Sequence, residues 1–380
     1  KASRKVNMPA GLYIHVPFCK SKCPYCHFYS TTETGCAARF IDALDREMRG
    51  YRHRFAAFDT IYIGGGTPSL LTIADLDRIL AAVHRHFTIA GDAETTVEVN
   101  PADANGAWFS DLHGLGVNRI HLGGQSFSAP ALQFLGRRHT PQDIYEAATL
   151  IRGAGFDNFG IDLIWGLPGQ NLADWRRDLT AALSLEPAHL SVYQLSAEPG
   201  TLLRRRLRRG EFSLPGEEPS LEFFLATDDL LGRASFLHYE VSNYARRPEF
   251  ASRHNGKYWR HVPYLGLGPS AHSFQDGQRW WNHRNLNEYL ASLADGRLPV
   301  AGSETLGPNE LRLETLFLGL RTADGIDLSS FRRRFGEDLR ETRKEILAAL
   351  ISEALLIIAE DCLKPTARGM ATADRLSIQL

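Results

Sequence analysis

Short β-rich runs alternate with longer amphipathic runs over the first half of the chain, and this alternation restricts the fold more than any other feature. The strand candidates are residues 12–16, 60–64, 95–99, 119–123, 159–166 and 189–195. Helical periodicity is clear between them, in residues 37–51, 73–87, 141–155 and 172–186. Because parallel strands need long crossover connections, this order is typical of βα units around a parallel sheet. We therefore expect an α/β fold in which six strands form a whole or partial barrel.

Each strand candidate leads into a loop of unusual composition. In chain order these loops contain PFCKSKCPYC, GGGTPS, EVNP, GGQSF, GLPGQ and SAEPGT. A single Gly or Pro usually marks only a turn. In parallel sheets and barrels, however, ligand sites collect at the carboxyl ends of the strands, because these ends and their loops converge on one face. Six such loops in register predict one large site.

The pattern changes twice further along the chain. From about residue 245 the alternation fades, and Trp, Tyr, His and Asn crowd together up to residue 290. Near Gly307 helical patterns return at 310–321 and 328–336, and residues 341–380 look like a helix, a short strand, a turn and a helix. These changes predict three domains, which are a barrel over residues 1–200, an α/β extension over 201–305 and a small helical domain over 306–380.

Charge and cysteine content limit the partners and the compartment. The 380 residues include 43 Lys plus Arg and 44 Asp plus Glu, and the formal charge of -1 provides no general attraction for nucleic acid or an anionic membrane. No apolar run is long enough to span a membrane, and the basic start KASRKVNMPAG lacks the apolar stretch of a signal peptide. Five cysteines in so long a chain indicate reduced thiols. We therefore expect a cytoplasmic protein that binds no nucleic acid and has no transmembrane segment, with transient membrane association left open.

Three of the five cysteines, Cys19, Cys23 and Cys26, lie in the loop after the first strand candidate. A structural zinc site usually takes four protein ligands in two separated pairs, whereas the other two cysteines lie outside this loop. A four-iron cluster held by three thiolates keeps one iron open for a further ligand. The loop therefore predicts an iron-sulfur cluster, and zinc completed by His15 or His27 remains the alternative.

The spacing Cys19-x3-Cys23-x2-Cys26, with Tyr25 before the third cysteine and a glycine-rich loop after the second strand, resembles the radical S-adenosylmethionine (SAM) superfamily. The resemblance implies a 4Fe-4S cluster whose open iron binds SAM, which is cleaved reductively to methionine and a 5'-deoxyadenosyl radical. Along nearly the whole chain it extends to the coproporphyrinogen III oxidase-like branch, which contains the oxidase HemN and the haem chaperone HemW. It implies a radical-SAM partial (βα)6 barrel, an α/β extension and a small C-terminal winged-helix-like helical domain.

The resemblance also implies a set of cofactor-binding residues. The glycines of the loop after the second strand let the backbone approach the methionine moiety of SAM closely, because glycine has no side chain. A carboxylate, an amide or an arginine at a strand end suits the hydroxyl, ammonium and carboxylate groups of SAM. The positions that match the branch are Tyr13, Tyr25, Gly64, Gly65, Gly66, Thr67, Glu98, Gln125, Arg137 and Asp162.

Within the branch, the residues favour the HemW type over the oxidase. Only twelve residues precede Tyr13, and His27 stands where the oxidase has a further cysteine. Residues 254–259, HNGKYW, match the HNxxYW motif associated with haem binding in HemW. The motif implies that His254 binds the haem iron and that Tyr258 and Trp259 supply flat apolar surface. A histidine among aromatics can equally be a hydrogen-bonded core residue, and that interpretation stays open.

Two departures from the HemW pattern point to a specialised relative. His27 replaces the usual Asp after the third cysteine, and Gly124 stands where many relatives have a branched residue. We expect a haem chaperone that carries haem as cargo to haem-accepting proteins, with the cluster reduced by an electron donor such as flavodoxin or ferredoxin. The alternative is a radical SAM enzyme, either an oxygen-independent oxidase or a HemN-like methyltransferase. Enzymatic turnover is left open, but a true coproporphyrinogen III dehydrogenase is not expected.

Overall fold

The computed structural model describes residues 8–380, so the basic start of the chain, residues 1–7, lies outside the described part. The chain divides into two compact units. The first unit comprises Lys1–Gly123, Leu135–Phe159 and Ser252–Thr305, and the second comprises Gly124–Phe134, Gly160–Ala251 and Leu306–Leu380. Each unit collects segments that are distant in the sequence. The division into domains at residues 200 and 305 stays a prediction.

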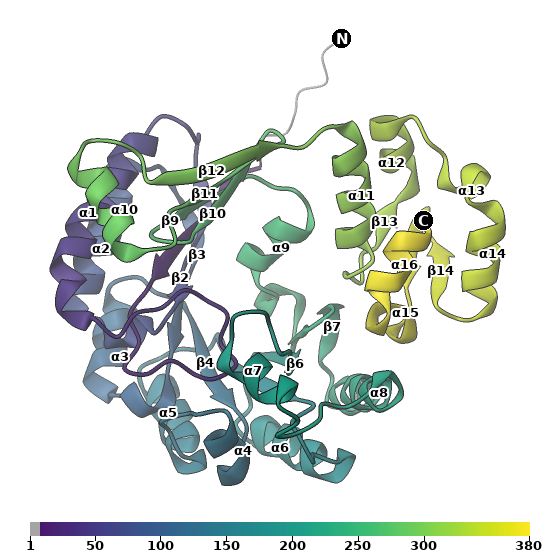
Figure 1. Ribbon diagram of the computed structural model, residues 1–380, viewed down its shortest axis with the longest axis horizontal. Helices are drawn as coiled ribbons and strands as arrows, with labels where there is room; N and C mark the ends of the chain where they lie inside the picture. The colour runs from purple at the N-terminus through teal and green to yellow at the C-terminus, as the bar shows by residue number, and fades with distance from the viewer. Residues whose placement is uncertain (1–7) are drawn as a thin grey trace. The chain divides into compact units, whose positions relative to one another are not determined.

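The first unit is built on parallel strands with helices packed against them (Figure 1). Its strands are β1 (Ala10–Val16), β2 (Phe58–Gly65), β3 (Ile89–Val99), β4 (Arg119–Gln125, of which the last two residues belong to the second unit), β9 (Tyr264–Leu267), β10 (His272–Gln275), β11 (Gln278–Asn282) and β12 (Val300–Thr305). Its helices are α1 (Ala37–Tyr51), α2 (Ile73–His86), α3 (Gly106–Gly114), α5 (Pro141–Gly153), α9 (Arg253–Trp259) and α10 (Leu286–Ala294), with short 3-10 turns η1 (Thr34–Cys36), η2 (Pro68–Leu70) and η3 (Pro101–Asp103).

Alternation along the strands sorts the side chains of this unit into two layers. Leu12, Ile14 and Val16 of β1 are fully buried on one face. The residues between them point to the opposite face, because successive side chains of a strand alternate. The parallel register, Tyr13 with Tyr62 and Glu98 with His121, places a row of polar and aromatic side chains on that second face. These side chains form the inner surface of the predicted barrel.

Local sequence explains where the helices begin. Thr72 starts α2 in a capping box with Asp75, and Thr140 starts α5 in the same way with Asp143. In each box the threonine side chain accepts from a backbone N–H that would otherwise lack a partner, and the aspartate accepts in return. Helix α1 spans Ala37–Tyr51, the bounds that periodicity predicts.

The second unit contains the remaining strands and the C-terminal part of the chain. Its strands are β5 (Phe159–Trp165), β6 (His189–Gln194), β7 (Leu237–Glu240), β8 (Asn243–Ala245), β13 (Ile326–Asp327), β14 (Leu356–Ala359) and β15 (Cys362–Pro365). Its helices are α4 (Ala129–Phe134), α6 (Leu172–Ser184), α7 (Leu202–Arg208), α8 (Glu217–Arg233), α11 (Pro308–Gly319), α12 (Leu328–Phe335), α13 (Leu339–Thr342), α14 (Lys344–Ser352), α15 (Ala367–Ala371) and α16 (Ala373–Gln379), with the 3-10 turn η4 (Pro248–Phe250). Strands β5 and β6 are parallel, whereas β8 and β7 continue from β6 as antiparallel strands.

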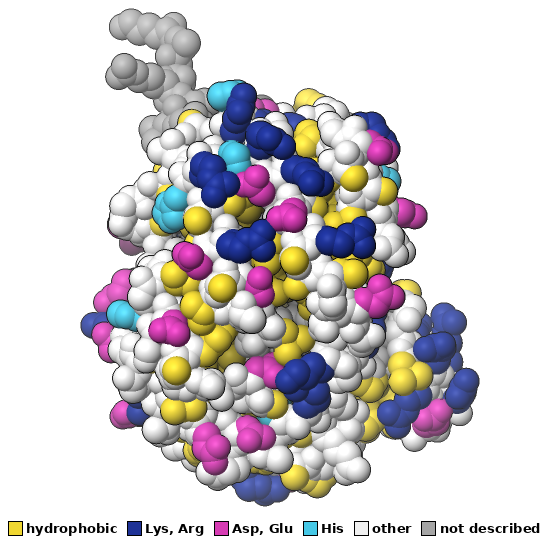
Figure 2. Space-filling view, turned by 90° about the vertical axis from the view of Figure 1, so that its left-hand side faces the viewer, with side chains coloured by type: hydrophobic (Ala, Val, Ile, Leu, Met, Phe, Trp, Pro, Cys, Tyr) yellow, Lys and Arg dark blue, Asp and Glu magenta, His cyan; other side chains and the backbone are white. Residues whose placement is uncertain are grey.

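Residues 306–380 have a hydrophobic core of their own. Leu316 of α11 and Leu320, which follows that helix, pack with Phe331 of α12 and with Leu356 and Leu363 of the small sheet. The sheet has the order β13-β15-β14, so the tail forms a hairpin, β14–β15, where one short strand was predicted. No helix between residues 8 and 380 combines the length and the apolar character needed to cross a bilayer. Figure 2 shows basic and acidic side chains interspersed over the face that it turns to the viewer.

All six predicted strands are present, but two features of the sheet are absent from the prediction. Strand β3 begins at Ile89 rather than at 95. The prediction missed its first residues because most of them are partly or fully exposed and lack an apolar pattern. The antiparallel strands β9 to β12 lie in the region where the alternation fades. Their central hairpin turns at Asp276 and Gly277, with φ angles of 51° and 79°. Asp-Gly is a strong hairpin signal, and the crowding of aromatic residues obscured it.

Candidate functional site

The three cysteines lie on one loop, residues 17–31, which we call the cysteine loop. It leaves the carboxyl end of β1 and is closed at its base by a bridge between Phe18 and Thr31. The N–H of Cys19 donates to the carbonyl of Thr31 at 2.9 Å, and the N–H of Thr31 donates to the carbonyl of Pro17 at 2.8 Å. Inside the loop, the N–H of Cys26 donates to the carbonyl of Cys23 at 3.2 Å. The backbone therefore fixes the three thiols within one compact turn of chain.

The thiols line a small cavity of about 60 Å³. Tyr25, Gly66, Thr67 and Arg137 line it as well. Arg137 lies after the short helix α4 in the connection between β4 and α5, which we call the loop after β4, so loops that follow β1, β2 and β4 meet at the cavity. The Cys19 Sγ lies 3.4 Å from the Thr67 Oγ1. This convergence agrees with the expectation that the carboxyl ends of parallel strands share one site. The thiols of Cys19, Cys23 and Cys26 are partly exposed and free of disulfides.

Arg137 is the main cation of this cavity. Its Nη1 donates to the Cys23 Sγ at 3.7 Å, and its Nη2 donates to the carbonyl of Gly123 at 2.9 Å. Burial by itself would lower the pKa of Arg137, but Tyr25 and Cys23 beside it leave that pKa raised. The Nε is buried and has no hydrogen-bond partner among the described residues. A buried guanidinium N–H without an acceptor is costly, so the site fits an anionic ligand group such as a carboxylate.

The glycine loop, Gly64 to Thr67, packs directly on the base of the cysteine loop. The N–H of Gly66 donates to the carbonyl of Val16, and that of Thr67 donates to the carbonyl of Phe18, each at 2.8 Å. A Cβ on Gly66 would lie 2.7 Å from both of these carbonyl oxygens. Gly65 has a φ of 105°, which side chains rarely adopt. The glycines are therefore required for the close approach of two backbones, whether or not a cofactor is bound.

Glu98 and Tyr13 lie on the inner face, close to the glycine loop. Glu98 accepts from the hydroxyl of Tyr62 at 2.8 Å and from the N–H of Gly65 at 3.0 Å. The Tyr13 hydroxyl lies 3.1 Å from the Nδ1 of His15. Burial raises the pKa of Tyr13, and Glu98 adds to this shift. Glu98 thus holds the glycine loop in place, and its contact with SAM stays a prediction.

Gln125 and Asp162 belong to the second unit. Gln125 ends β4 with a φ of 68°, an uncommon backbone conformation for a residue other than glycine. Asp162 lies in the middle of β5 and pairs in register with Ser191 of β6. Gln125 therefore lies at a strand end, as the sequence pattern indicates, whereas Asp162 lies three residues before the end of its strand. Their predicted contacts with SAM remain predictions.

His15, one of the two candidate zinc ligands, is engaged elsewhere. Its Nε2 lies 2.9 Å from the carbonyl of Tyr29, which can only accept, so in the neutral ring this nitrogen carries the proton. The Nδ1 then accepts from the Tyr13 hydroxyl. Burial lowers the pKa of His15 to about 4, which keeps the ring neutral at physiological pH. Among residues 8–380, no three His, Cys, Asp or Glu side chains are grouped closely enough to hold a single metal ion. His15 therefore connects β1 to the far end of the cysteine loop.

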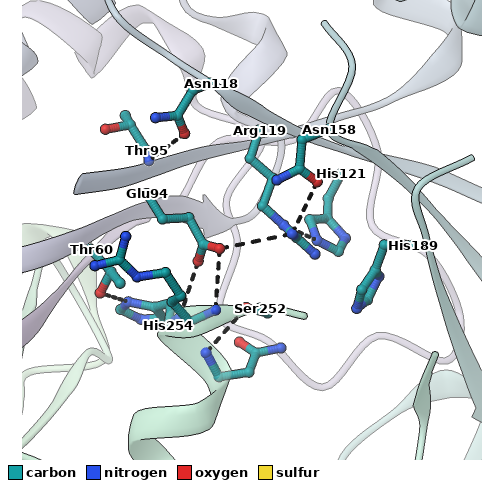
Figure 3. Close-up of polar contacts among 12 residues, drawn as sticks. Thr60, Glu94, Thr95, Asn118, Arg119, His121, Asn158, His189, Ser252 and His254 are labelled. Carbon is teal, nitrogen blue, oxygen red and sulfur yellow. Dashed lines mark hydrogen bonds and ion pairs between the residues drawn. The ribbon is translucent and has the colours of Figure 1, made fainter. Parts of the chain in front are cut away.

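The HNGKYW segment forms helix α9, and its histidine is buried rather than presented to a ligand (Figure 3). His254 is 1% exposed. Its Nδ1 lies 2.8 Å from the Thr60 Oγ1, and its Nε2 lies 2.8 Å from the Tyr258 hydroxyl. Burial, with a smaller contribution from Lys257, lowers the pKa of His254 to about 3. Both ring nitrogens are occupied, so haem ligation by His254 requires the bond to Thr60 or Tyr258 to open.

A buried carboxylate fixes the start of α9. Glu94 of β3 accepts from the backbone N–H groups of Arg253 and His254 at 3.1 and 3.0 Å. It also lies 3.8 Å from the guanidinium of Arg119, as Figure 3 shows. At the other end of the helix, the indole Nε1 of Trp259 is buried and has no hydrogen-bond partner within residues 8–380. The sequence prediction missed Glu94 and Arg119, because nothing in the local pattern links β3 to a helix so distant in sequence.

Comparison with known proteins agrees with this geometry. Residues 13–182 match the Radical SAM superfamily model, and residues 306–372 match the HemN C-terminal domain model. The heme chaperone HemW of Synechocystis sp. is 39% identical over 91% of this chain and 85% of its own length. The heme chaperone HemW of Mycobacterium tuberculosis is 38% identical over 96% of this chain and 93% of its own length.

A solved structure gives the same fold. Coproporphyrinogen III oxidase (HemN) from Escherichia coli superposes with a TM-score of 0.83 at 23% identity, covering 98% of this chain and 89% of that one. The similarity confirms the predicted radical SAM α/β fold with a separate C-terminal domain. The sequence identity to the HemW proteins, which extends over most of their length, shows the family to which the chain belongs. The chain belongs to the radical SAM superfamily, in the HemN/HemW family.

Proposed function

We propose that this protein is a haem chaperone of the HemW type, which binds haem and passes it to haem-accepting proteins. The observation that carries the proposal is the sequence identity to several proteins named heme chaperone HemW, between 31% and 40% over most of the chain. His27 in place of a further cysteine supports it, because the chain then differs from the oxidase at the cysteine loop itself. The acceptor proteins and an electron donor such as flavodoxin or ferredoxin are the expected partners.

The cysteine loop is the proposed holder of a 4Fe-4S cluster, with Cys19, Cys23 and Cys26 as its ligands. When bound, such a cluster supplies one electron, and its open iron binds SAM. Around it, the Arg137 Nε would donate to the SAM carboxylate, since it is a buried donor that has no hydrogen-bond partner among residues 8–380. The glycine loop would face the methionine moiety, and Tyr25 closes one side of the cavity. These residues bind and orient the cofactor and exclude water from it.

Haem binding through HNGKYW is the second part of the proposal. Tyr258 and Trp259 are only partly buried and supply aromatic surface. Ligation of haem iron by His254 would require Tyr258 to leave the Nε2. The variant Tyr258→Phe removes that hydrogen bond without removing the ring. If His254 is the ligand, Tyr258→Phe keeps or strengthens haem binding, whereas His254→Ala changes the Soret spectrum.

A specific observation keeps a catalytic function as the second candidate. The cavity at the cysteines, with its buried unpartnered donor, has the features of a cofactor site rather than of a purely structural loop. The discriminating experiment is anaerobic reconstitution followed by parallel assays of haem binding and of coproporphyrinogen III decarboxylation with SAM and a reductant. The chaperone proposal expects stoichiometric haem binding without decarboxylation. Robust decarboxylation, or haem affinity equal to that of an unrelated protein, would overturn it. The control for His254→Ala is His272→Ala, which replaces an exposed histidine of β10.

A further inference from the structure

Asp103, a residue outside every motif of the sequence, contacts three loops of the cofactor site. It ends the 3-10 turn η3, directly after the carboxyl end of β3, and its side chain is 5% exposed. Its Oδ1 accepts from the Lys20 Nζ at 3.1 Å. Its Oδ2 accepts from the Arg138 Nη2 at 2.9 Å and from the Ser69 Oγ at 3.2 Å. One nearly buried carboxylate is therefore bonded to a lysine, an arginine and a hydroxyl at once.

Each of the three donors comes from a different loop. Lys20 lies in the cysteine loop, between the first and second cysteines. Ser69 lies in η2, immediately after the glycine loop, and Arg138 follows Arg137 in the chain. These are the loops after β1, β2 and β4, which together line the cavity at the thiols. Asp103 thus connects the segments whose relative positions determine the shape of that cavity.

The position of Asp103 is itself fixed by the backbone around it. The Asn100 side chain accepts from the N–H of Ala102 at 3.1 Å and starts the turn that carries Asp103. The N–H of Asn100 donates to the Ser69 Oγ at 3.1 Å, so Ser69 links the two loops in both directions. Such a carboxylate does not need to reorganise when a ligand arrives. It can hold its partners in place before a cofactor binds.

Asp103 also determines which of two adjacent arginines faces the thiols. Arg138 is paired with Asp103, whereas Arg137 contacts Cys23 and has an Nε without a hydrogen-bond partner among the residues that the structure describes. Arg138 also lines the cavity, so without the carboxylate its charge would be free to compete with Arg137 for an anion. Lys20, whose side chain is 56% exposed, would lose its anchor and could turn into solvent.

We propose that Asp103 is a positioning residue of the cofactor site, which fastens the loops after β1, β2 and β4 and assigns the anion-binding role to Arg137 rather than to Arg138. The inference rests on the proposed cofactor site but not on haem transfer. It concerns the arrangement of this chain's own residues toward SAM. Asp103 itself need not touch the cofactor.

The test compares Asp103→Asn and Asp103→Ala with Asp338→Asn. Asp338 is a matched control, because it pairs with two cationic side chains as Asp103 does, here Arg332 and Arg340, but lies in the C-terminal domain. Anaerobically reconstituted proteins are assayed for iron content and, by equilibrium dialysis, for SAM affinity. We expect full iron content and a roughly tenfold or greater loss of SAM affinity in the Asp103 variants, since the loops around the cavity lose the carboxylate that holds Lys20 and Arg138 in place. Asp338→Asn should retain the SAM affinity of the wild type.

A second readout needs no cofactor. In the apoprotein, limited proteolysis should cut the cysteine loop several-fold faster in the Asp103 variants than in the wild type. The control Asp338→Asn should not speed this cleavage, even if it lowers the thermal midpoint of unfolding as much as the Asp103 variants do. This readout separates the inference from the proposed cluster, because loop cleavage is measured without iron. Unchanged SAM affinity together with unchanged cleavage would overturn the inference.

The milder variants Lys20→Met and Arg138→Gln serve if Asp103→Ala fails to fold. A double-mutant cycle between Asp103→Asn and Arg138→Gln should show that the two losses of SAM affinity are not additive. Arg138→Gln alone should weaken SAM binding less than Arg137→Gln does. Additive losses, or an Arg138 variant as damaging as the Arg137 variant, would contradict the assigned roles.

Discussion

The cysteine loop and helix α9 both carry motifs of chemically reactive residues, yet the structure treats them in opposite ways. At the cysteine loop, three thiols are partly exposed around a cavity, and a buried N–H of the Arg137 guanidinium lacks a hydrogen-bond partner in the described part of the chain. In α9, His254 is 1% exposed and both of its ring nitrogens are hydrogen-bonded within the protein. The ring of His254 is therefore satisfied within the protein, whereas the Trp259 Nε1 of the same helix is buried and has no hydrogen-bond partner within residues 8–380. A motif alone does not distinguish a site from a structural element; the contacts of each of its side chains have to be compared.

The largest expected effect is on cluster binding. Replacing Cys19, Cys23 or Cys26 by Ala should abolish the iron-sulfur absorption of the anaerobically reconstituted protein, because each thiolate holds one iron. Cys36→Ala and Cys362→Ala should leave the absorption intact, since neither cysteine lines the cavity. Loss of the absorption in Cys36→Ala would show that cluster binding requires a cysteine outside the cysteine loop.

The free energy of unfolding should respond most strongly to substitution of His254 in α9. His254→Ala leaves the Thr60 and Tyr258 hydroxyls without their partner and creates a cavity, which should cost about 3 kcal/mol or more. His84→Ala, at an exposed position of α2, should change the free energy of unfolding by less than about 0.5 kcal/mol. Urea unfolding of the apoproteins measures both values. Equal effects of the two variants would mean that the contacts of His254 contribute nothing to folding.

Substitution at the cavity of the cysteine loop should change the free energy of SAM binding by a smaller amount. Arg137→Gln should weaken binding by about 1.5 to 3 kcal/mol, because a charge-assisted bond to a desolvated carboxylate is lost. Isothermal titration of the reconstituted protein gives this value, with iron content measured alongside. Arg177→Gln, on the exposed side of α6, is the control. An Arg137 variant with the affinity of the wild type would place the SAM carboxylate elsewhere.

The last expected effect is a difference in pH dependence. The folded pKa of His254 is about 3, whereas a histidine in the unfolded chain titrates near 6.5, so the unfolded state binds the extra proton first as the pH falls. The stability that neutral His254 provides is therefore complete above pH 6.5 and is lost as the pH falls toward 3, at about 1.4 kcal/mol per pH unit. The variant His254→Gln should lack this slope when both proteins are unfolded between pH 4 and 6.5.

Comparison with the variant is needed because Glu47 opposes this trend. Glu47 is buried and accepts from the Tyr289 hydroxyl, the Asn282 amide and the N–H of Gly268. Burial raises its pKa to about 7, so the folded protein keeps a proton that the unfolded chain releases above about 4.5. Stability from this group falls as the pH rises between these two values. An identical slope in wild type and His254→Gln would contradict the neutral, buried state of His254.

Sequence reasoning succeeded where local pattern decides the structure. Helix α1 follows from its apolar spacing, and the periodic runs at 73–87 and 141–155 correspond to α2 and α5. The strands β1 to β6 follow from short β-rich runs that end in glycine or polar loops. The cysteine loop follows from three thiols at fixed spacing. In each case the residues that form the feature are neighbours in the sequence.

It failed where distant residues meet. Asp103 is ordinary in the sequence, and its role appears only when Lys20, Ser69 and Arg138 are brought to it by three different strands. The burial of His254 likewise depends on Thr60, 194 positions away. The sequence leaves both interpretations of His254 open, a haem ligand or a hydrogen-bonded core residue, because the partners of its ring nitrogens are invisible in the local sequence.

The central claim, that the cysteine loop is an incomplete site that a cluster and SAM complete, is tested most directly by electron paramagnetic resonance. The reconstituted, reduced protein is measured with and without SAM, beside Arg137→Gln. The account predicts a 4Fe-4S signal that SAM shifts in the wild type and shifts only at much higher SAM concentration in the variant. A cluster signal that SAM leaves unchanged in the wild type would contradict it.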